Sequence, residues 1–152
     1  MSQKLAMQEF QRGVELLQHR CPEQAYLHIE RAFHMDNENP YYVSYMGLTM
    51  GVARRQWADA EILCQKAVKL RRNHPVFYLN LAEVYRRSGR KEDAVAALER
   101  GLLNTGNSPM IKHALGKLTP RQRPTIPFLK RTSSVNRKLG ALRHQLSQFL
   151  HS

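Results

Sequence analysis

A few side chains in this sequence have the chemistry to hold a metal ion. His19 lies two residues before Cys21 and His28 lies six before His34, and both residue types bind Zn²⁺. A structural zinc site needs four ligands at a fixed geometry, so ordinary surface groups on a helical hairpin explain these pairs better. Cys64 falls at an apolar position of its segment, and we expect it in the core.

The motifs that build common catalytic sites are absent from the sequence. It contains no G-x-S-x-G, no Walker loop and no H-E-x-x-H. The spacing of His144 and His151 places both on one helix face, but two ligands do not make a metal site. We therefore expect no enzyme activity, no cofactor and no metal.

Charge is distributed unevenly along the 152 residues, whose formal net charge is +12. Residues 1–99 carry 14 Lys+Arg against 12 Asp+Glu, whereas residues 100–152 carry 10 Lys+Arg and no acidic side chain. No apolar run approaches the roughly 20 residues of a membrane helix, and the N-terminus has no secretory apolar segment. Two cysteines without C-x-x-C spacing suit a reducing compartment. We expect one small cytoplasmic domain with a cationic tail.

A repeat of 34 or 35 residues organises the nearly neutral body. Pro40, Pro75 and Pro109 lie 35 and 34 residues apart, and one extra residue in the second unit is placed in its turn. Small residues recur in phase, because two antiparallel helices that cross closely need Gly or Ala where the backbones meet. These registers are Gly13, Gly47, Ala82 and Gly116, then Ala25, Ala60 and Ala94, then Ala32, Ala67 and Gly101.

Each unit is typical of two amphipathic helices joined by a turn. Gly89 stands where a helix ends with a left-handed residue. Pro22, Pro75 and Pro109 suit first helical positions, and Ser108 is a good N-cap before Pro109. An all-α fold follows.

The residues at the small and apolar positions of the three units follow a shared pattern. They are Gly13, Leu16, Ala25, Ile29 and Ala32, then Gly47, Trp57, Ala60, Cys64 and Ala67, then Tyr78, Leu81, Ala82, Tyr85, Gly89, Ala94, Leu98 and Gly101. This pattern resembles the tetratricopeptide repeat (TPR) family. The resemblance implies an α-solenoid of antiparallel helix pairs over residues 1–118, with repeats at about 6–39, 40–74 and 75–108 and a capping helix at 109–118.

Proteins of this family present a concave groove lined by the first helix of each repeat, so the resemblance implies the lining residues. The extra residue of the second unit leaves Gly51 and Val52 uncertain in register. The implied partner-binding residues are Met7, Phe10, Val14, Leu17, Tyr41, Ser44, Leu48, Val76, Leu79, Glu83, Arg86, Arg87, Met110, His113 and Lys117.

Two family subtypes fit the sequence poorly. Some members clamp the acidic tails of heat-shock chaperones with Lys, Asn and Arg side chains, and of the corresponding positions only Asn80 matches. The type III secretion chaperones are similar in size but typically acidic, unlike the basic tail of this chain. The clamp positions compared are Phe10, Val14, Tyr45, Val76 and Asn80.

The cationic tail divides into two segments. Residues 119–133 contain three prolines and four basic residues and form a predicted extended linker. Residues 134–151 form a predicted basic amphipathic helix with one apolar stripe. The stripe consists of Val135, Leu139, Leu142, Leu146, Phe149 and Leu150. We expect it to pack on the repeats, with a second copy or another protein and then an anionic membrane as alternatives.

The function that the sequence favours is a scaffold that binds a peptide or helix of a partner protein in its groove. Phe10, Tyr41, Leu48 and Leu79 would be apolar anchors. Arg86, Arg87 and Lys117 would select acidic neighbours. The C-terminal helix is a candidate occupant of the groove and a candidate homodimer contact. The alternative is nucleic-acid or membrane binding through the tail, although Phe128 and Phe149 are too few aromatics for a stacking platform.

Truncation after Leu118 tests whether the repeats fold alone. Three units and a capping helix meet the usual minimum for a stable stack. We expect the truncated chain to keep most of its helical circular dichroism and to melt cooperatively. Loss of the cooperative melt would show that the tail is part of the core.

Overall fold

The computed structural model describes residues 1–119. The predicted linker from residue 120 onward and the predicted helix 134–151, with its stripe from Val135 to Leu150, lie outside the described residues. Within residues 1–119 the chain forms seven α-helices and no strand. They are α1 (Ser2–Gln18), α2 (Pro22–Met35), α3 (Pro40–Arg54), α4 (Trp57–Leu70), α5 (Pro75–Arg87), α6 (Lys91–Asn104) and α7 (Pro109–Leu118).

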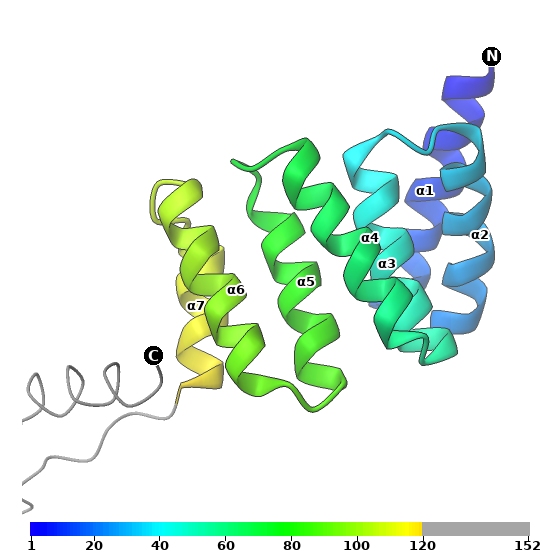
Figure 1. Ribbon diagram of the computed structural model, residues 1–152. Coiled ribbons are helices and arrows are strands. Elements are labelled where there is room, and N and C mark those ends of the chain that lie inside the picture. The colour runs from blue at the N-terminus through cyan, green and yellow to red at the C-terminus, as the bar shows by residue number, and fades with distance from the viewer. Residues whose placement is uncertain (120–152) are drawn as a thin grey trace, which may run out of the picture. The chain divides into compact units, whose positions relative to one another are not determined.

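The helices pack as successive antiparallel pairs. Helix α1 packs on α2, α3 on α4 and α5 on α6, and each pair also contacts the next along the chain (Figure 1). Helix α7 closes the row against α5 and α6. This confirms the predicted all-α solenoid for the described residues.

Local sequence signals set where the helices start and stop. Four helices begin at a proline, whose fixed φ suits the first turn. At the start of α3 the Asn39 Oδ1 atom accepts a hydrogen bond from the Tyr41 backbone N–H at 3.0 Å. Gly89 ends α5 with φ +83°, as predicted. Ser108 occupies the N-cap of α7, where its carbonyl oxygen accepts from the Lys112 N–H at 3.1 Å, but its side chain forms no capping bond.

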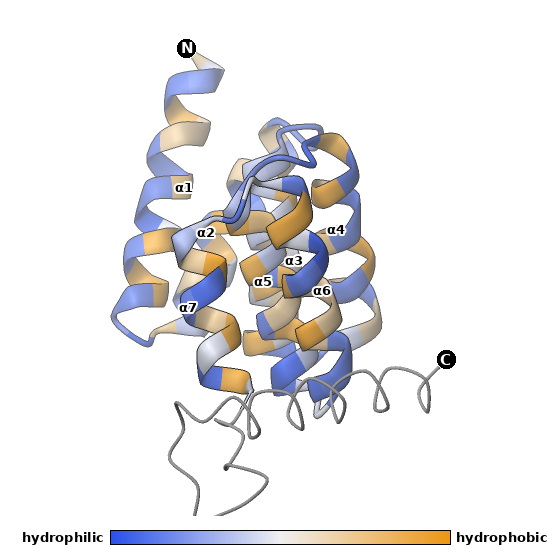
Figure 2. Ribbon diagram, turned by 90° about the vertical axis from the view of Figure 1, so that its left-hand side faces the viewer, coloured by the Kyte–Doolittle hydropathy of each residue, from blue (hydrophilic) through white to orange (hydrophobic). Residues whose placement is uncertain are grey.

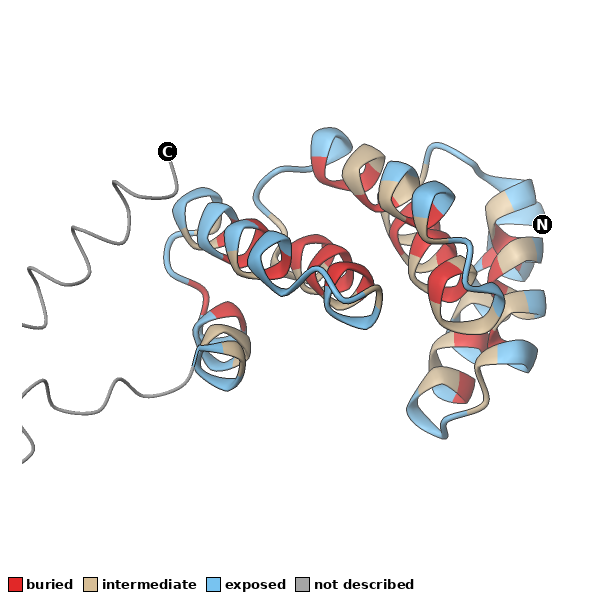
Figure 3. Ribbon diagram, turned by 60° about the horizontal axis from the view of Figure 1, so that its bottom comes forward, coloured by how far each residue is buried: buried red, intermediate tan, exposed pale blue. Residues whose placement is uncertain are grey.

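Each helix contributes buried residues to the stack, and α3 is covered most completely, with no exposed residue between Pro40 and Ala53. Each helix contains both apolar and polar residues (Figure 2). Its buried residues lie on the sides that face neighbouring helices (Figure 3). The largest buried cluster spans α3 to α7 and centres on Phe77, Tyr78, Leu81 and Leu98. A smaller one joins Ala6, Ala32 and Tyr42 of the first three helices. The core is therefore concentrated in the second and third repeats.

The small residues lie where the paired backbones cross. Ala25, Ala60 and Ala94 are fully buried, as the repeat predicted. A Cβ atom built on Gly47 would lie 2.7 Å from the Cys64 Sγ and 2.8 Å from the Ala60 carbonyl oxygen. No side chain larger than hydrogen fits there without moving α3 away from α4.

Gly116 departs from the other residues of its register. A Cβ built on it would meet no described atom within 4 Å, since α7 has no second helix of its own among residues 1–119. Helix α7 instead faces the stack through Ile111, which is fully buried. It covers the end of the third repeat, which is the capping arrangement that the sequence predicted.

Two details differ from the sequence prediction. The extra residue of the second unit lies in a helix and not in a turn, because α3 extends to Arg54 and leaves only Arg55 and Gln56 before α4. The longer helix is accommodated by Gly51, where a Cβ would lie 2.8 Å from the Trp57 ring. The first helix begins at Ser2, four residues before the predicted start of the first repeat.

Within residues 1–119 no helix has the length and apolar character required to cross a membrane. The same residues contain no group of three or more His, Cys, Asp or Glu side chains arranged to bind a metal ion. Cys64 is fully buried, as predicted, and burial raises the pKa of its thiol far above the usual value.

Two glycines of one register make a matched test of this packing. Gly47→Ala should destabilise the full chain by about 1–3 kcal/mol, because the new methyl group overlaps Cys64 and Ala60. Gly116→Ala should be neutral or stabilise by up to about 1 kcal/mol, because alanine favours the helix. Chemical denaturation measures both. Equal effects of the two substitutions would contradict the assignment of Gly47 to a close helix crossing.

Candidate functional site

An open hollow of about 510 Å³ lies among α1, α3 and α5, the first helices of the three pairs. Leu17, Leu48 and Val52 are half-buried and contribute apolar surface, while the exposed Arg20 and Arg87 contribute positive charge. We call it the apolar hollow. Its lining residues are Leu17, Arg20, Pro22, Leu48, Val52, Glu83 and Arg87.

Arg20 is held at the apolar hollow by the way α1 ends. Its φ is +59°, and the N–H groups of Arg20 and Cys21 donate to the carbonyl oxygens of Leu17 and Leu16 at 3.1 and 2.8 Å. Gly89 makes the equivalent turn after α5 with φ +83°. A left-handed arginine costs roughly 1 kcal/mol compared with glycine. The first repeat therefore carries a cation where the third has only a glycine.

A second hollow, of about 260 Å³, continues the surface toward α7. We call it the C-terminal hollow. Glu83 lines both hollows, so they are neighbouring parts of one groove along α5. The lining residues of the C-terminal hollow are Leu79, Ala82, Glu83, Arg86, Leu98, Ala114, Lys117 and Leu118.

Glu83 organises the charge in the groove. Its carboxylate accepts two hydrogen bonds from Arg86 at 2.8 Å and one from Arg87. Partial burial raises the pKa of Glu83, but the bonds and charges of the two arginines outweigh it and hold the pKa below its usual value. Glu83 is thus ionised at neutral pH. It orients both guanidinium groups and offsets one of their two charges.

The structure brings part of the predicted set together in this groove. Met7 and His113 are exposed but line neither hollow, while Phe10, Val14 and Val76 are half-buried. Phe10 packs against the rings of Tyr42 and Tyr45, with centroid distances of 5.0 and 5.2 Å, and so anchors α1 to α3. The predicted residues that line the two hollows are Leu17, Leu48, Leu79, Glu83, Arg86, Arg87 and Lys117.

Ser44 is wrongly predicted as a lining residue. It is fully buried, and its hydroxyl oxygen accepts a hydrogen bond from the Asn80 Nδ2 at 3.0 Å. Both residues face the contact between α3 and α5, where a small hydroxyl and an amide satisfy each other. The Asn80 amide, the one match to the chaperone-tail clamp, is therefore engaged inside the stack.

Some lining residues were not anticipated. Arg20 and Pro22 lie around the turn between α1 and α2, whereas the family pattern considers only first helices. Ala114 and Leu118 line the C-terminal hollow from α7, outside the lining positions implied for this helix. Val52 was left uncertain in register, and it lines the apolar hollow from α3.

Tyr41 has a different environment from that of an open anchor. Its ring packs edge-on against His74 and Phe77, and its hydroxyl lies 2.9 Å from the His74 Nε2. Arg71 donates to the same hydroxyl at 3.4 Å, so the hydroxyl is free to donate to a neutral His74. Burial first, and the charge of Arg71 second, lower the pKa of His74.

Comparison with known proteins agrees with this geometry. The tetratricopeptide repeat family model matches residues 52–118. No curated protein sequence matches the chain.

Three solved structures share the fold at low identity. The first TPR of Spaghetti (RPAP3), bound to the HSP90 peptide SRMEEVD, has a TM-score of 0.62 and 19% identity over 78% of this chain and 95% of its own. The second TPR domain of human RPAP3, in complex with the HSP70 peptide SGPTIEEVD, has a TM-score of 0.62 and 17% identity. The match covers 80% of this chain and 100% of that domain. The Yersinia enterocolitica type III secretion chaperone SycD, in complex with a peptide of the translocator YopD, has a TM-score of 0.58 and 16% identity. The match covers 74% of this chain and 85% of the chaperone chain.

The His74 environment generates a pH prediction. A histidine whose folded pKa lies below the unfolded value of about 6.5 contributes stability above that pH, and loses it as the pH falls. We expect the melting midpoint to fall between about pH 7.5 and about pH 5.5, and to fall less in His74→Gln, which keeps a hydrogen-bond acceptor but cannot titrate. If the melting midpoints of the wild type and of His74→Gln fell equally with pH, His74 would not be the group responsible for the loss of stability.

Proposed function

We propose that the protein, whose residues 52–118 match the tetratricopeptide repeat family model, is a non-enzymatic scaffold that binds a peptide or helix of a partner protein along α1, α3 and α5. The observation that carries this proposal is the apolar hollow. It combines half-buried aliphatic side chains with exposed guanidinium groups in one open space of about 510 Å³. That combination suits a segment with an apolar anchor flanked by acidic residues.

Proteins with the same fold support the proposal at the level of class. The RPAP3 and SycD structures hold peptides, so this arrangement of helices is suited to peptide capture. A ligand recognised through the chaperone-tail clamp is a poor candidate here, because Phe10 packs between aromatic rings and Asn80 donates to Ser44. We propose apolar anchoring instead as the main source of affinity.

The charged residues would act mainly on selectivity. Arg20 and Arg87 flank the apolar hollow, and Arg86 and Lys117 flank the C-terminal hollow. Exposed charges at the rim of a binding site change association rate and partner choice more than affinity. A partner with acidic residues on both sides of its apolar anchor would match the cations at both hollows.

The predicted helix 134–151 is a candidate occupant of the same groove in cis or from a second copy. The support is its apolar stripe, Val135 to Leu150, in the sequence. If it occupies the groove, removal of residues 119–152 should tighten partner binding, because a competitor has been removed.

Binding of nucleic acid or an anionic membrane through the tail is the second candidate function. It is favoured by the absence of acidic side chains among residues 100–152, which carry 10 Lys+Arg. Binding of that kind weakens steeply as salt increases, because phosphate contacts release counterions. Capture through the apolar hollow should depend on salt only weakly, and affinities at two salt concentrations separate the two functions.

Site-specific crosslinking tests the leading proposal. A photo-reactive phenylalanine derivative at Leu48, in the apolar hollow, should capture a partner that mass spectrometry identifies. The same group at Ile62, an exposed apolar residue of α4 outside the groove, should not capture it. With the partner identified, Leu48→Ala should weaken binding about tenfold or more, and Ile62→Ala by less than about twofold.

Two outcomes would overturn the proposal. One is a partner captured equally from positions 48 and 62. The other is an affinity that Leu48→Ala leaves unchanged while its melting midpoint matches that of the wild type. Equal melting midpoints of the two alanine variants exclude loss of folding as the cause of weaker binding.

A further inference from the structure

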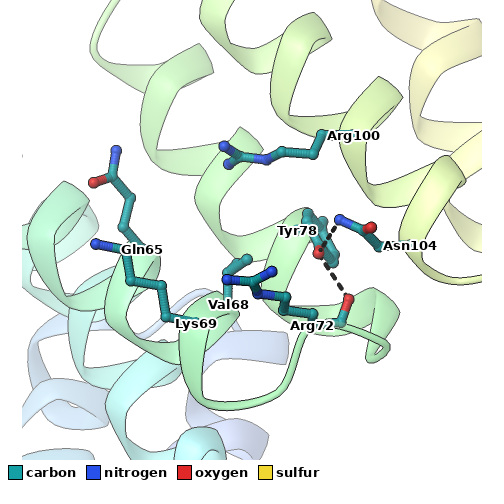
Figure 4. Close-up of a pocket in the computed structure, with 7 residues that line it drawn as sticks. All are labelled: Gln65, Val68, Lys69, Arg72, Tyr78, Arg100 and Asn104. Carbon is teal, nitrogen blue, oxygen red and sulfur yellow. Dashed lines mark hydrogen bonds between the residues drawn. The ribbon is translucent and has the colours of Figure 1, made fainter.

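A third hollow, of about 340 Å³, lies away from the groove, among α4, α6 and the start of α5. Figure 4 shows its lining side chains. The buried Val68 and Tyr78 form its base, and no residue that lines it also lines the apolar or C-terminal hollow. We call it the basic hollow.

Three cations surround the basic hollow. Lys69 belongs to α4, Arg72 to the turn after α4, and Arg100 to α6, from which its side chain reaches toward α4 (Figure 4). No acidic side chain lines the hollow. Within residues 1–119 none of the three forms an ion pair or a side-chain hydrogen bond, whereas Lys66 and Arg90 nearby are both paired with glutamates. All three side chains are exposed, and they line one hollow that no acidic side chain lines.

The polar groups around these cations hold the hollow in shape. The Tyr78 hydroxyl donates to the carbonyl oxygen of Arg72 at 2.7 Å and accepts from the Asn104 Nδ2 at 2.9 Å. The phenol thereby ties the turn that carries Arg72 to the last residue of α6. Asn104 retains a second amide hydrogen for a ligand. A site whose backbone is already ordered loses less entropy when it binds an anion.

The missing negative charge cannot come from side chains of the tail. Residues 100–152 contain no Asp or Glu, so neither the C-terminal part of α6 nor any residue after it can supply a carboxylate side chain. Glu61 of α4 already accepts hydrogen bonds from Arg90, Tyr85 and Gln65. An anion bound in the hollow would therefore not compete with an acidic side chain that lines it.

We propose that the basic hollow binds a phosphoryl group. A dianion matches a hollow lined by several cations better than a single carboxylate does, and planar guanidinium groups fit phosphate oxygens in a paired geometry. Arg72 and Arg100 would donate from opposite sides, Lys69 would add a point charge, and Asn104 would donate a neutral hydrogen bond. The phosphoryl group could be carried by a peptide or be free in solution, with the same contacts.

Titration of the full chain with three probes tests the site. The probes are inorganic phosphate, a short phosphoserine peptide with neutral flanking residues, and the same peptide with glutamate in place of phosphoserine. We expect saturable binding of the phosphorylated probe at about 0.15 M salt, followed by calorimetry and by the NMR signal of the Asn104 side-chain amide. Tighter binding of the peptide identifies a peptide-borne group, and equal binding of inorganic phosphate identifies a free anion; both support phosphoryl recognition.

Charge-matched variants separate a site from general attraction. Arg100→Gln and Arg72→Gln should each weaken binding about tenfold or more, because each removes a charge-assisted hydrogen bond. Lys91→Gln removes the same charge from the exposed start of α6 and should change affinity less than about twofold. Equal weakening by Lys91→Gln, equal affinity for the glutamate peptide, or no saturable binding would each overturn the proposal. Since Leu48→Ala leaves the basic hollow intact, failure of the groove proposal would not affect this result.

Discussion

The close crossing of paired helices is the constraint on which the rest of this structure depends. At Gly47 the backbone of α3 approaches α4 so closely that a single added carbon would lie 2.7 Å from the Cys64 sulfur. At Gly101 the same restriction applies to α6, where a Cβ would lie 2.7 Å from the Tyr78 ring and 2.9 Å from Ile111. These contacts set the spacing within each pair and bring α5, α6 and α7 together.

The spacing of the helices in turn creates the surfaces that can bind. The first helices leave the apolar hollow open beside Leu48, while α4 and α6 leave the basic hollow open beside Tyr78. Both surfaces stand on the same buried cluster, in which Tyr78 and Leu81 are fully inaccessible. A packed core of this kind resists deformation, so both hollows keep their shape without a ligand.

The groove and the basic hollow differ in how their positive charges are paired. In the groove, Glu83 is bound by Arg86 and Arg87, which fixes their guanidinium groups and reduces the net positive charge. In the basic hollow no described acid performs that role for Lys69, Arg72 and Arg100. The groove is therefore suited to apolar contacts with charged selection at its rim, and the basic hollow to an anion. The two proposals rest on this physical difference.

The sequence by itself determined the class of fold, the period of the repeat, the prolines that begin four helices and the glycine that follows α5. These features depend on local signals: prolines at helix starts, Gly89 at a helix end, and small residues recurring in phase at Ala25, Ala60 and Ala94. These signals act within one helix turn or one repeat, so they can be recognised without knowing how neighbouring helices pack.

Only the tertiary structure decided which side chains of a first helix are open. Ser44 occupies a lining position of the repeat but is buried and bonded to Asn80, while the half-buried Val52, whose register was uncertain, lines the apolar hollow. Likewise, Lys69 and Arg100 are 31 residues apart in the sequence, and they line one hollow because α4 and α6 both pack against α5. Such placements follow from contacts between helices, and those contacts exist only once the whole stack has packed.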